Sequence, residues 1–275
     1  MIRISIILLF FILFLSNIND SEAADDIKST SQNQLNIEDG NVAKHDFVYS
    51  LDNAREVFFN YHKDPVNFEN SIDILDGVLS NEPDNVDAMI FLSRVWLTFG
   101  HYIEDNTTEK WERFRKGSEI AQQAIKLSPY NADAYFYYVA NEASLAKSKG
   151  AFGSIFLISK IKKGLNKTLE LNPNHAEAIA MKGAILYTIP ALMGGDIKES
   201  ERLIREALVM EPHITSTKIF LAKNLYKQKH YEEAKRVLSE ILNEENPKVE
   251  ADWYLNKRVA IKMIKNINDI EHKQS

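Results

Sequence analysis

The sequence has no cysteine among its 275 residues. Without cysteine the chain forms no disulfide, has no thiolate nucleophile and has no acceptor for an N-terminal lipid. The hydrophobic core alone must therefore hold the fold together, even if the protein is exported to an oxidising compartment.

The motifs of common catalytic and nucleotide-binding sites are also missing. The sequence contains no G-x-S-x-G, no G-x-G-x-x-G, no G-x-x-x-x-G-K-[ST] and no HExxH. Its seven histidines include no pair at metal-ligand spacing, and His175 and Glu177 lie where a helix is expected to begin, so we interpret them as capping or solvated groups. We predict a non-enzymatic protein with no catalytic residues, no metal site and no cofactor.

A large excess of either charge is absent too. The formal net charge is −6, from 33 basic and 39 acidic residues. Mild acidity favours solubility and argues against nucleic-acid binding over a broad surface. We therefore expect no nucleic acid among the partners.

The longest apolar run lies at the N-terminus and is too short for a comfortable transmembrane helix. Arg3 precedes apolar residues 4–15, and Ser21 and Ala23 fit a signal-peptidase site. We interpret residues 1–23 as a cleaved signal peptide of a periplasmic or secreted protein that is not a lipoprotein, with an uncleaved anchor as the alternative. Residues 24–45 are polar and lack apolar periodicity, which predicts a disordered tether.

Five of the seven prolines end similar phrases in the rest of the chain. These prolines are Pro83, Pro129, Pro173, Pro212 and Pro247, and the interval between them shortens from 46 to 35 residues. Apolar residues at helical spacing precede and follow them, and an acid opens the helix after three of them: Asp87, Asp133 and Glu177. A repeat of this length with two helices per unit is typical of a helical solenoid.

Residues 215–247 closely resemble a tetratricopeptide repeat. Ala222 matches the small residue where the two helices touch, Leu225 the large residue one turn on, and Tyr231 and Ala234 open the second helix. The resemblance implies an all-α, right-handed α-solenoid of about five such helix hairpins with a C-terminal capping helix. The equivalent contact positions in earlier units are Ser93, Val139 and Gly183, of which Val139 departs from the small-residue pattern.

The prolines also divide the array into units. The expected boundaries are about 46–83, 84–129, 130–173, 174–212 and 213–247, followed by a capping helix and tail over 248–275. The unequal intervals place extra residues between the two helices of a unit, at 101–110, 147–156 and 188–195.

In tetratricopeptide proteins the first helix of each unit lines a concave groove. Counting from each proline gives its expected lining here: Ile90, Arg94, Leu97, Phe136, Tyr187, Ile219, Lys223 and Tyr226. Because the set is largely apolar and only Lys223 fits a carboxylate clamp, we predict a partner's apolar segment or a small apolar ligand in the groove. Burial of some of these residues between units is the alternative.

Acidic residues are missing from Ala143 to Leu169. Six lysines lie within this stretch: Lys147, Lys149, Lys160, Lys162, Lys163 and Lys167. With apolar residues interleaved at helical spacing, the segment fits contact with an anionic membrane surface or an acidic partner. Because Leu165 and Leu169 match core positions of other units, we favour the interpretation that the apolar face is repeat core and the lysines are a solvated rim.

The stretch TIPALMGGDIKES, residues 188–200, has the outline of a phosphate-binding loop because Gly194 and Gly195 precede a helix. The helix begins with Asp196, however, and Glu199 follows three residues later in a capping-box arrangement. A carboxylate there repels phosphate, so we predict a stretched hairpin turn, with Leu192 and Met193 available to a partner.

The irregular units and the loop ending in GGD are similar to the T component of TRAP-type solute transporters, a family of exported bacterial tetratricopeptide proteins. That likeness implies association with a solute-binding protein or an apolar ligand. A similar helical layout occurs in a microtubule-regulator family related to such repeats, but the signal peptide argues against an intracellular role.

Three hypotheses for function follow from these observations. The leading one is a non-enzymatic periplasmic or secreted scaffold for protein–protein interaction through the concave groove. The alternative is an accessory component of a solute transporter, and the third is peripheral membrane contact through the lysines of 147–167.

Overall fold

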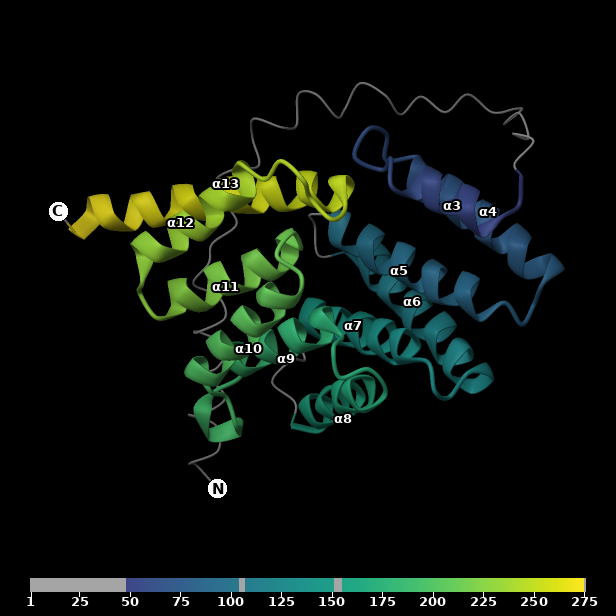
Figure 1. The fold of residues 1–275 in the computed structure, drawn as a ribbon, viewed down its shortest axis with the longest axis horizontal. Coiled ribbons are helices and arrows are strands. Elements are labelled where there is room, and N and C mark those ends of the chain that lie inside the picture. The colour runs from purple at the N-terminus through teal and green to yellow at the C-terminus, as the bar shows by residue number, and fades with distance from the viewer. Residues whose placement is uncertain (1–47, 104–106, 151–154, 275) are drawn as a thin grey trace. The chain divides into compact units, whose positions relative to one another are not determined.

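The chain folds into helical hairpins, and no strand occurs in residues 48–103, 107–150 and 155–274, which this computed structural model describes (Figure 1). The first helices of the hairpins are α3 (Leu51–Phe58), α5 (Val86–Tyr102), α7 (Ala132–Ser148), α9 (Ala176–Thr188) and α11 (Thr215–Lys227). The second helices are α4 (Asn67–Asn81), α6 (Thr108–Leu127), α8 (Ile155–Leu171), α10 (Ile197–Met210) and α12 (Tyr231–Leu242), and α13 (Glu250–Gln274) follows them. The predicted all-α array of about five hairpins with a C-terminal helix is confirmed. The predicted signal peptide and tether lie outside the described residues.

After three of the repeat prolines, Pro83, Pro129 and Pro173, the residue two positions on caps the helix that follows. Asn85 and Asn131 each accept a hydrogen bond from the backbone N–H three residues on, at 2.9 and 3.1 Å. His175 does the same through Nδ1 at 3.3 Å, while its Nε2 lies 3.1 Å from Asp133 of the preceding hairpin. Such caps stabilise a helix by about 1 kcal/mol. His175 therefore has the capping role expected from its position.

The two helices of a hairpin approach closely at small residues. A Cβ added to Gly183 of α9 would lie 2.7 Å from Ile204 Cγ1 of α10. In the third hairpin the small position holds Val139, and Gly164 of α8 faces it: a Cβ on Gly164 would lie 2.1 Å from Val139 Cγ2. In this hairpin the small residue of the contact lies on the second helix instead of the first. This arrangement explains how Val139 is accommodated without separating α7 from α8.

Buried apolar clusters hold the array together at both ends. The first surrounds Phe58 and Phe68 of α3 and α4, and the Phe68 ring stacks on Phe99 of α5 with centroids 4.4 Å apart. The second surrounds Leu225 of α11 and Leu238 of α12, both fully buried. Because each cluster combines successive hairpins, every hairpin depends on its neighbours for a complete core.

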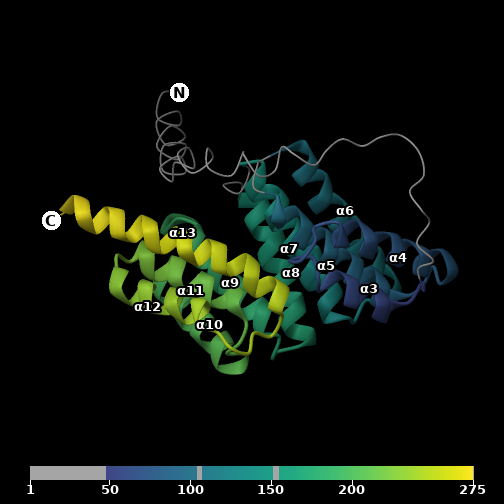
Figure 2. The ribbon, with the colours of Figure 1, turned by 90° about the horizontal axis from the view of Figure 1, so that it is seen from above.

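Helix α13 packs on the last hairpin and also reaches the first ones. It runs along α11 and α12 (Figure 2), where Ala260 and Ile267 are fully buried in the second cluster. At its N-terminal end, Ala251 is fully buried in the cluster of α3, α4 and α5. The predicted capping role is confirmed, whereas the contact with the first hairpins is new.

The connection between α9 and α10 is a tight turn. Pro190 leads into a short 3-10 helix, η2 (Ala191–Met193), and Gly194 follows in the left-handed region with φ of 82°. Asp196 then accepts hydrogen bonds from the N–H groups of Lys198 and Glu199, both at 3.0 Å. The N–H groups that a phosphate would need are therefore occupied by Asp196, as the hairpin-turn interpretation requires.

Among the described helices, none is both long enough and apolar enough to cross a membrane.

Candidate functional site

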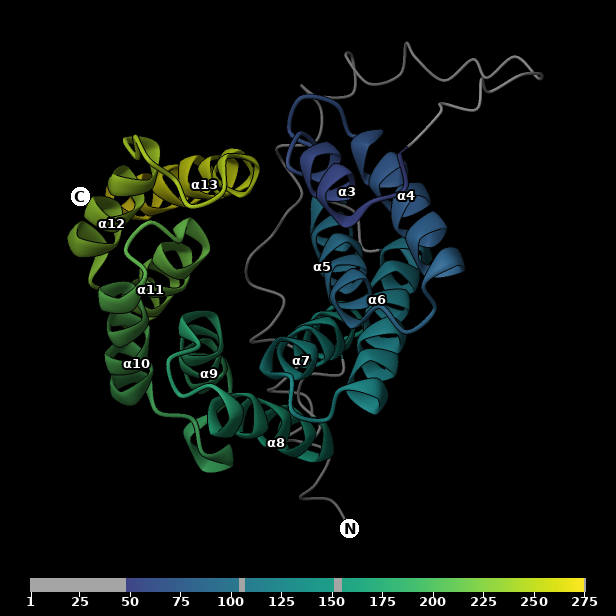
Figure 3. The same ribbon diagram turned by 45° about the vertical axis from the view of Figure 1, so that its right-hand side comes forward.

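The first helices line the inner side of the curve that the hairpins follow, and the second helices lie on the outer side (Figure 3). Three of the predicted groove residues, Ile90, Phe136 and Ile219, are only 9, 9 and 4% exposed. Each belongs to a packing cluster between helices. These three side chains therefore shape the inner side but offer little surface to a partner.

The other five predicted groove residues keep part of their surface exposed. They are Arg94 and Leu97 on α5, Tyr187 on α9, and Lys223 and Tyr226 on α11. Tyr187 and Tyr226 both pack against the cluster of α11, α12 and α13, and burial raises the pKa of Tyr187. The exposed part of the inner side is thus aromatic and cationic near α9 and α11.

Arg94 is not free in this arrangement, because α13 supplies a counter-ion for it. Its Nη2 lies 3.1 Å from Asp252 Oδ2, and its Cζ lies 5.3 Å from the centre of the Phe59 ring. The Tyr61 hydroxyl donates to Asp252 Oδ1 at 3.0 Å. Burial, and then the negative charge of Asp252, raise the pKa of Tyr61, so its hydroxyl remains a donor at neutral pH.

A second contact joins α13 to the first hairpins. The rings of His62, which follows α3, and Tyr254 of α13 stack 4.8 Å apart and nearly parallel, at 11°. The sequence predicted Arg94 as a groove residue but did not identify Tyr61, Asp252 or Tyr254. No sequence signal marks them, since an acid and a tyrosine in a terminal helix are typical of a solvated face.

Lys223 has no counter-ion, in contrast to Arg94. In the part of the chain that the structure describes, neither Lys223 nor Lys147 has an ion-pair or hydrogen-bond partner. Burial, and then the positive charge of Lys147, lower the pKa of Lys223 to about 8. The inner side therefore carries a half-buried ammonium group that lacks compensation from an acid.

The part of the lysine-rich segment that lies in α8 packs as a repeat helix. Ile158, Ile161 and Leu165 of α8 are at most 5% exposed and belong to the core shared with α7 and α9. Lys160 pairs with Glu142 of α7 at 2.6 Å, and Lys167 pairs with Glu170 at 2.8 Å. Lys147, Lys149 and Lys163 are exposed, and Lys162 is half-buried. The described apolar residues of α8 are thus used in packing, which favours the solvated-rim interpretation over membrane contact.

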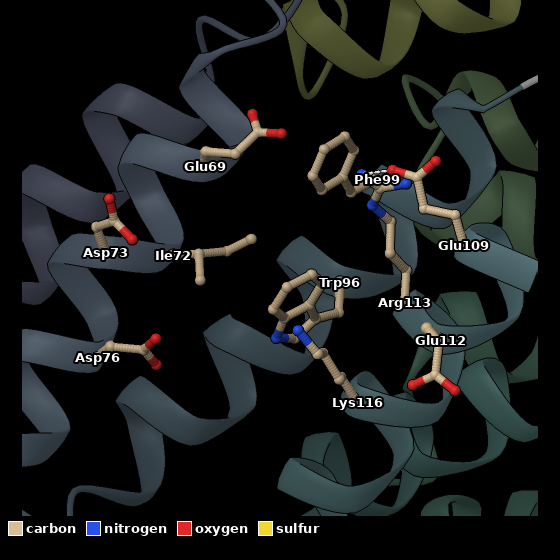
Figure 4. A pocket seen from close by; sticks show the side chains of 10 residues that line it. All are labelled: Glu69, Ile72, Asp73, Asp76, Trp96, Phe99, Glu109, Glu112, Arg113 and Lys116. Atoms are coloured by element: carbon tan, nitrogen blue, oxygen red, sulfur yellow. Dashed lines mark ion pairs between the residues drawn. The ribbon is translucent and has the colours of Figure 1, made fainter. Parts of the chain in front are cut away.

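A cleft of about 460 Å³ lies between α4 and α6, and residues of α5 also line it. Figure 4 shows the carboxylates of Glu69, Asp73 and Asp76 on one wall and the cations of Arg113 and Lys116 on the other. Trp96, Phe99 and Ile72 provide its apolar surface. Since α4 and α6 are second helices, this cleft is separate from the predicted groove lining.

The described ranges contain no group of three or more His, Asp or Glu side chains that could share one metal ion.

Comparison with solved structures establishes the fold. The tetratricopeptide protein TTC0263 of Thermus thermophilus aligns with a TM-score of 0.55 at 16% identity, over 76% of this chain and 98% of that one. PilF of Pseudomonas aeruginosa aligns with a TM-score of 0.44 at 15% identity, over 80% and 92% of the two chains. YrrB, described as a tetratricopeptide protein with an unusual peptide-binding site, gives 0.37 at 15% identity, over 74% and 89%. The alignment with TTC0263 shows that the chain has the fold of a tetratricopeptide protein.

No curated protein sequence matches the chain. A family model, however, matches residues 52–194, and its description is regulator of microtubule dynamics protein 1-3. The matched region runs from α3 through the turn after α9 and comprises more than half of the 275 residues. Of the families to which the sequence was likened, the microtubule regulators are the one that a family model supports. The chain therefore belongs to the family of regulator of microtubule dynamics proteins 1-3.

Proposed function

We propose that this protein is a non-enzymatic scaffold that binds a segment of a protein partner on its inner side. The observation that carries the proposal is Lys223, a half-buried ammonium group without an acidic partner, on the helix that also presents Tyr226. Tyrosines supply large contact area at low entropic cost, and an unpaired cation favours a ligand that brings a carboxylate.

The chemistry of the surface defines the partner segment. Tyr187, Tyr226 and Leu97 favour apolar or aromatic side chains, and Lys223 with Lys147 favours an acidic residue among them. A carboxylate beside Lys223 would offset both burial and the repulsion from Lys147, so binding would raise the pKa of Lys223 again. Arg94 contributes less, because Asp252 already neutralises it.

The proposed compartment is the periplasm or the exterior of the cell, on the basis of residues 1–23. The family's name refers to microtubule dynamics, and we do not extend that activity to this chain, because export would separate it from cytoplasmic microtubules. Co-sedimentation of the full chain with microtubules tests this choice. Specific, saturable pelleting would reverse it.

The alternative role is an accessory component of a solute transporter that binds a small apolar ligand. The same tyrosine-lined surface would serve such a ligand, but the unpaired Lys223 then has no function unless the ligand is an acid. Native mass spectrometry of the protein isolated from its own host separates the two roles. A bound small molecule of constant mass favours the transporter role.

A matched pair of double variants tests the scaffold proposal. The test variant combines Lys223→Gln and Tyr226→Ser, which change the inner side. The control variant combines Lys126→Gln and Tyr130→Ser, which remove an exposed lysine from the end of α6 and an exposed tyrosine from the turn after it. Each form of the chain is chemically cross-linked to its neighbours in its own host. Proteins that cross-link to the wild type should no longer cross-link to the test variant but should still cross-link to the control variant. Identical cross-linked proteins from all three forms would contradict the proposal.

A further inference from the structure

Helix α4 presents three carboxylates on one face. Glu69, Asp73 and Asp76 are spaced by four and three residues, which places them on successive turns, and all three line the cleft between α4 and α6 (Figure 4). None of the three carboxylates forms an ion pair or a hydrogen bond with another described side chain. The wall formed by α4 therefore carries three carboxylates without a paired cation.

The cations on the opposite wall form no ion pair with these acids, because they lie on aromatic rings. Arg113 Cζ lies 3.7 Å from the centre of the Phe99 ring, and Lys116 Nζ lies 4.4 Å from that of Trp96. Arg113 also pairs with Glu109 of its own helix at 2.6 Å. Attraction to the ring faces and to Glu109 thus keeps both cations on the α6 side.

The electrostatics of the cleft show what it lacks. Burial is the main cause that raises the pKa values of Glu69 and Asp76, and for Asp76 the charge of Asp73 adds to it. The charge of Arg113 opposes the rise for Glu69, and that of Lys116 opposes it for Asp76, so the two cations offset the burial only in part. Five carboxylates line the cleft, of which Glu109 pairs with Arg113 and Glu112 with Arg115, so the three carboxylates of α4 are the ones without an ion pair. An additional cation between the walls would relieve both the burial cost and the mutual repulsion.

The α6 wall adds a requirement for an acceptor. Arg113 Nη1 is buried and has no hydrogen-bond partner among the described residues, while the side chain as a whole is only 13% exposed. Leaving such a charged donor unsatisfied is costly, and a carbonyl oxygen entering the cleft would satisfy it. A ligand that fits must therefore offer a cation to α4 and an oxygen acceptor to Arg113.

A single metal ion does not meet these conditions. The three carboxylates of α4 are not grouped closely enough to ligate one ion. The cleft volume, about 460 Å³, lies in the range of sites that take small organic groups or a few side chains. A peptide combines the required parts, with a Lys or Arg side chain for α4, a backbone carbonyl for Arg113 and methylene groups for Trp96 and Ile72.

We propose that the cleft between α4 and α6 binds a basic segment of a protein partner, with a lysine or arginine of that segment facing Glu69, Asp73 and Asp76. The charged walls of this site lie on the second helices α4 and α6, and it shares no residue with the inner-side site that carries the proposed function. The protein would then hold two segments of opposite character, an acidic apolar one on the inner side and a basic one in this cleft.

Fluorescence anisotropy with the full chain tests this site, using a labelled Lys-rich peptide and a Glu-rich peptide of equal length as probes. The cleft variant is Glu69→Gln, Asp73→Asn and Asp76→Asn. The control variant changes the net charge equally through Glu56→Gln, Glu240→Gln and Asp269→Asn, three exposed acids on α3, α12 and α13. We expect the Lys-rich peptide to bind the wild type and the control, and to bind the cleft variant about tenfold or more weakly.

Trp96 gives a readout confined to the cleft. Binding of the Lys-rich peptide should change tryptophan fluorescence, and Trp96→Phe should remove most of that change, while Trp111 and Trp253 remain as an internal reference. Circular dichroism of each variant establishes that it is folded. Equal losses of affinity in the cleft and control variants would show only general charge attraction and overturn the proposal. So would a folded wild type that binds neither peptide, or binds both alike.

Discussion

The contact between Val139 and Gly164 provides a direct test of how the third hairpin closes. Val139 is 1% exposed, and a Cβ on Gly164 would lie 2.1 Å from its Cγ2, well inside van der Waals contact. A buried, β-branched valine has little rotamer freedom with which to move away. Gly164→Ala should therefore strain the crossing of α7 and α8.

The magnitude follows from two opposing effects. Overpacking of a core contact costs about 1–3 kcal/mol, and exchanging glycine for alanine within a helix returns about 1 kcal/mol, so the net loss is about 0–2 kcal/mol. Val139→Ala alone loses two buried methyl groups, about 1.6 kcal/mol at about 0.8 each, and also leaves a cavity. With both changes, the methyl group introduced by Gly164→Ala enters the vacated space, so the double variant should be more stable than additivity predicts by about 1 kcal/mol or more.

Urea unfolding followed by circular dichroism, combined with hydrogen exchange of α7 and α8, measures this coupling. Lys163→Ala on the exposed side of α8 controls for substitution in the same helix. Hydrogen exchange is needed because repeat arrays do not always unfold in one step. Additivity of the two changes within about 0.5 kcal/mol, or a stabilised Gly164→Ala single variant, would refute the proposed exchange of small and large residues.

Three other changes have definite expectations. Asp252→Asn should cost about 1–2 kcal/mol and accelerate hydrogen exchange at the N-terminal end of α13, because the neutral amide has only one acceptor oxygen for Arg94 and Tyr61 and no charge for Arg94; unchanged exchange there would contradict this contact between α13 and the first hairpins. For Lys223, the folded-state pKa of about 8 lies below the ordinary value of 10.5, so its charge destabilises the fold fully below pH 8, and this penalty fades as the pH rises from 8 to 10.5. Lys223→Gln should therefore raise the thermal midpoint at pH 7, with an advantage that shrinks by pH 10; a gain independent of pH would argue against the lowered pKa. Asp196→Ala should cost about 1 kcal/mol through loss of the α10 cap, whereas Asp196→Asn should be nearly neutral, and equal losses in thermal denaturation would exclude capping as the cause.

Much of the fold was predictable because its signals are local. The proline phrases, the acids of the first turns and the apolar spacing act within a few residues, and they gave the all-α array of hairpins with a terminal capping helix. Position counting also located the small-residue contact, where Gly183 lies as expected, and it identified Asp196 as a helix cap.

The candidate site was predictable only in part. Counting from the prolines placed Lys223 and Tyr226 on a first helix with exposed surface. It left burial of some lining residues as an alternative, but it did not indicate that Ile90, Phe136 and Ile219 are the buried ones. The period of the repeat fixes which side of a helix a residue occupies. The extent of burial depends on the side chains of the neighbouring hairpins, which differ from unit to unit.

The sequence by itself determined the helices, their caps and their pairing, because these depend on contacts between residues close in the chain. The tertiary structure alone decided which distant groups meet. Arg94 and Asp252 are 158 residues apart, and their ion pair exists only because the curve of the array returns α13 to the first hairpins. The cleft arises in the same way: three of its five acids come from one hairpin, and its other acids, its cations and its rings come from the next, so no single segment contains the whole site. Packing between units, which no local pattern encodes, thus decides which charges are neutralised and which remain for a partner.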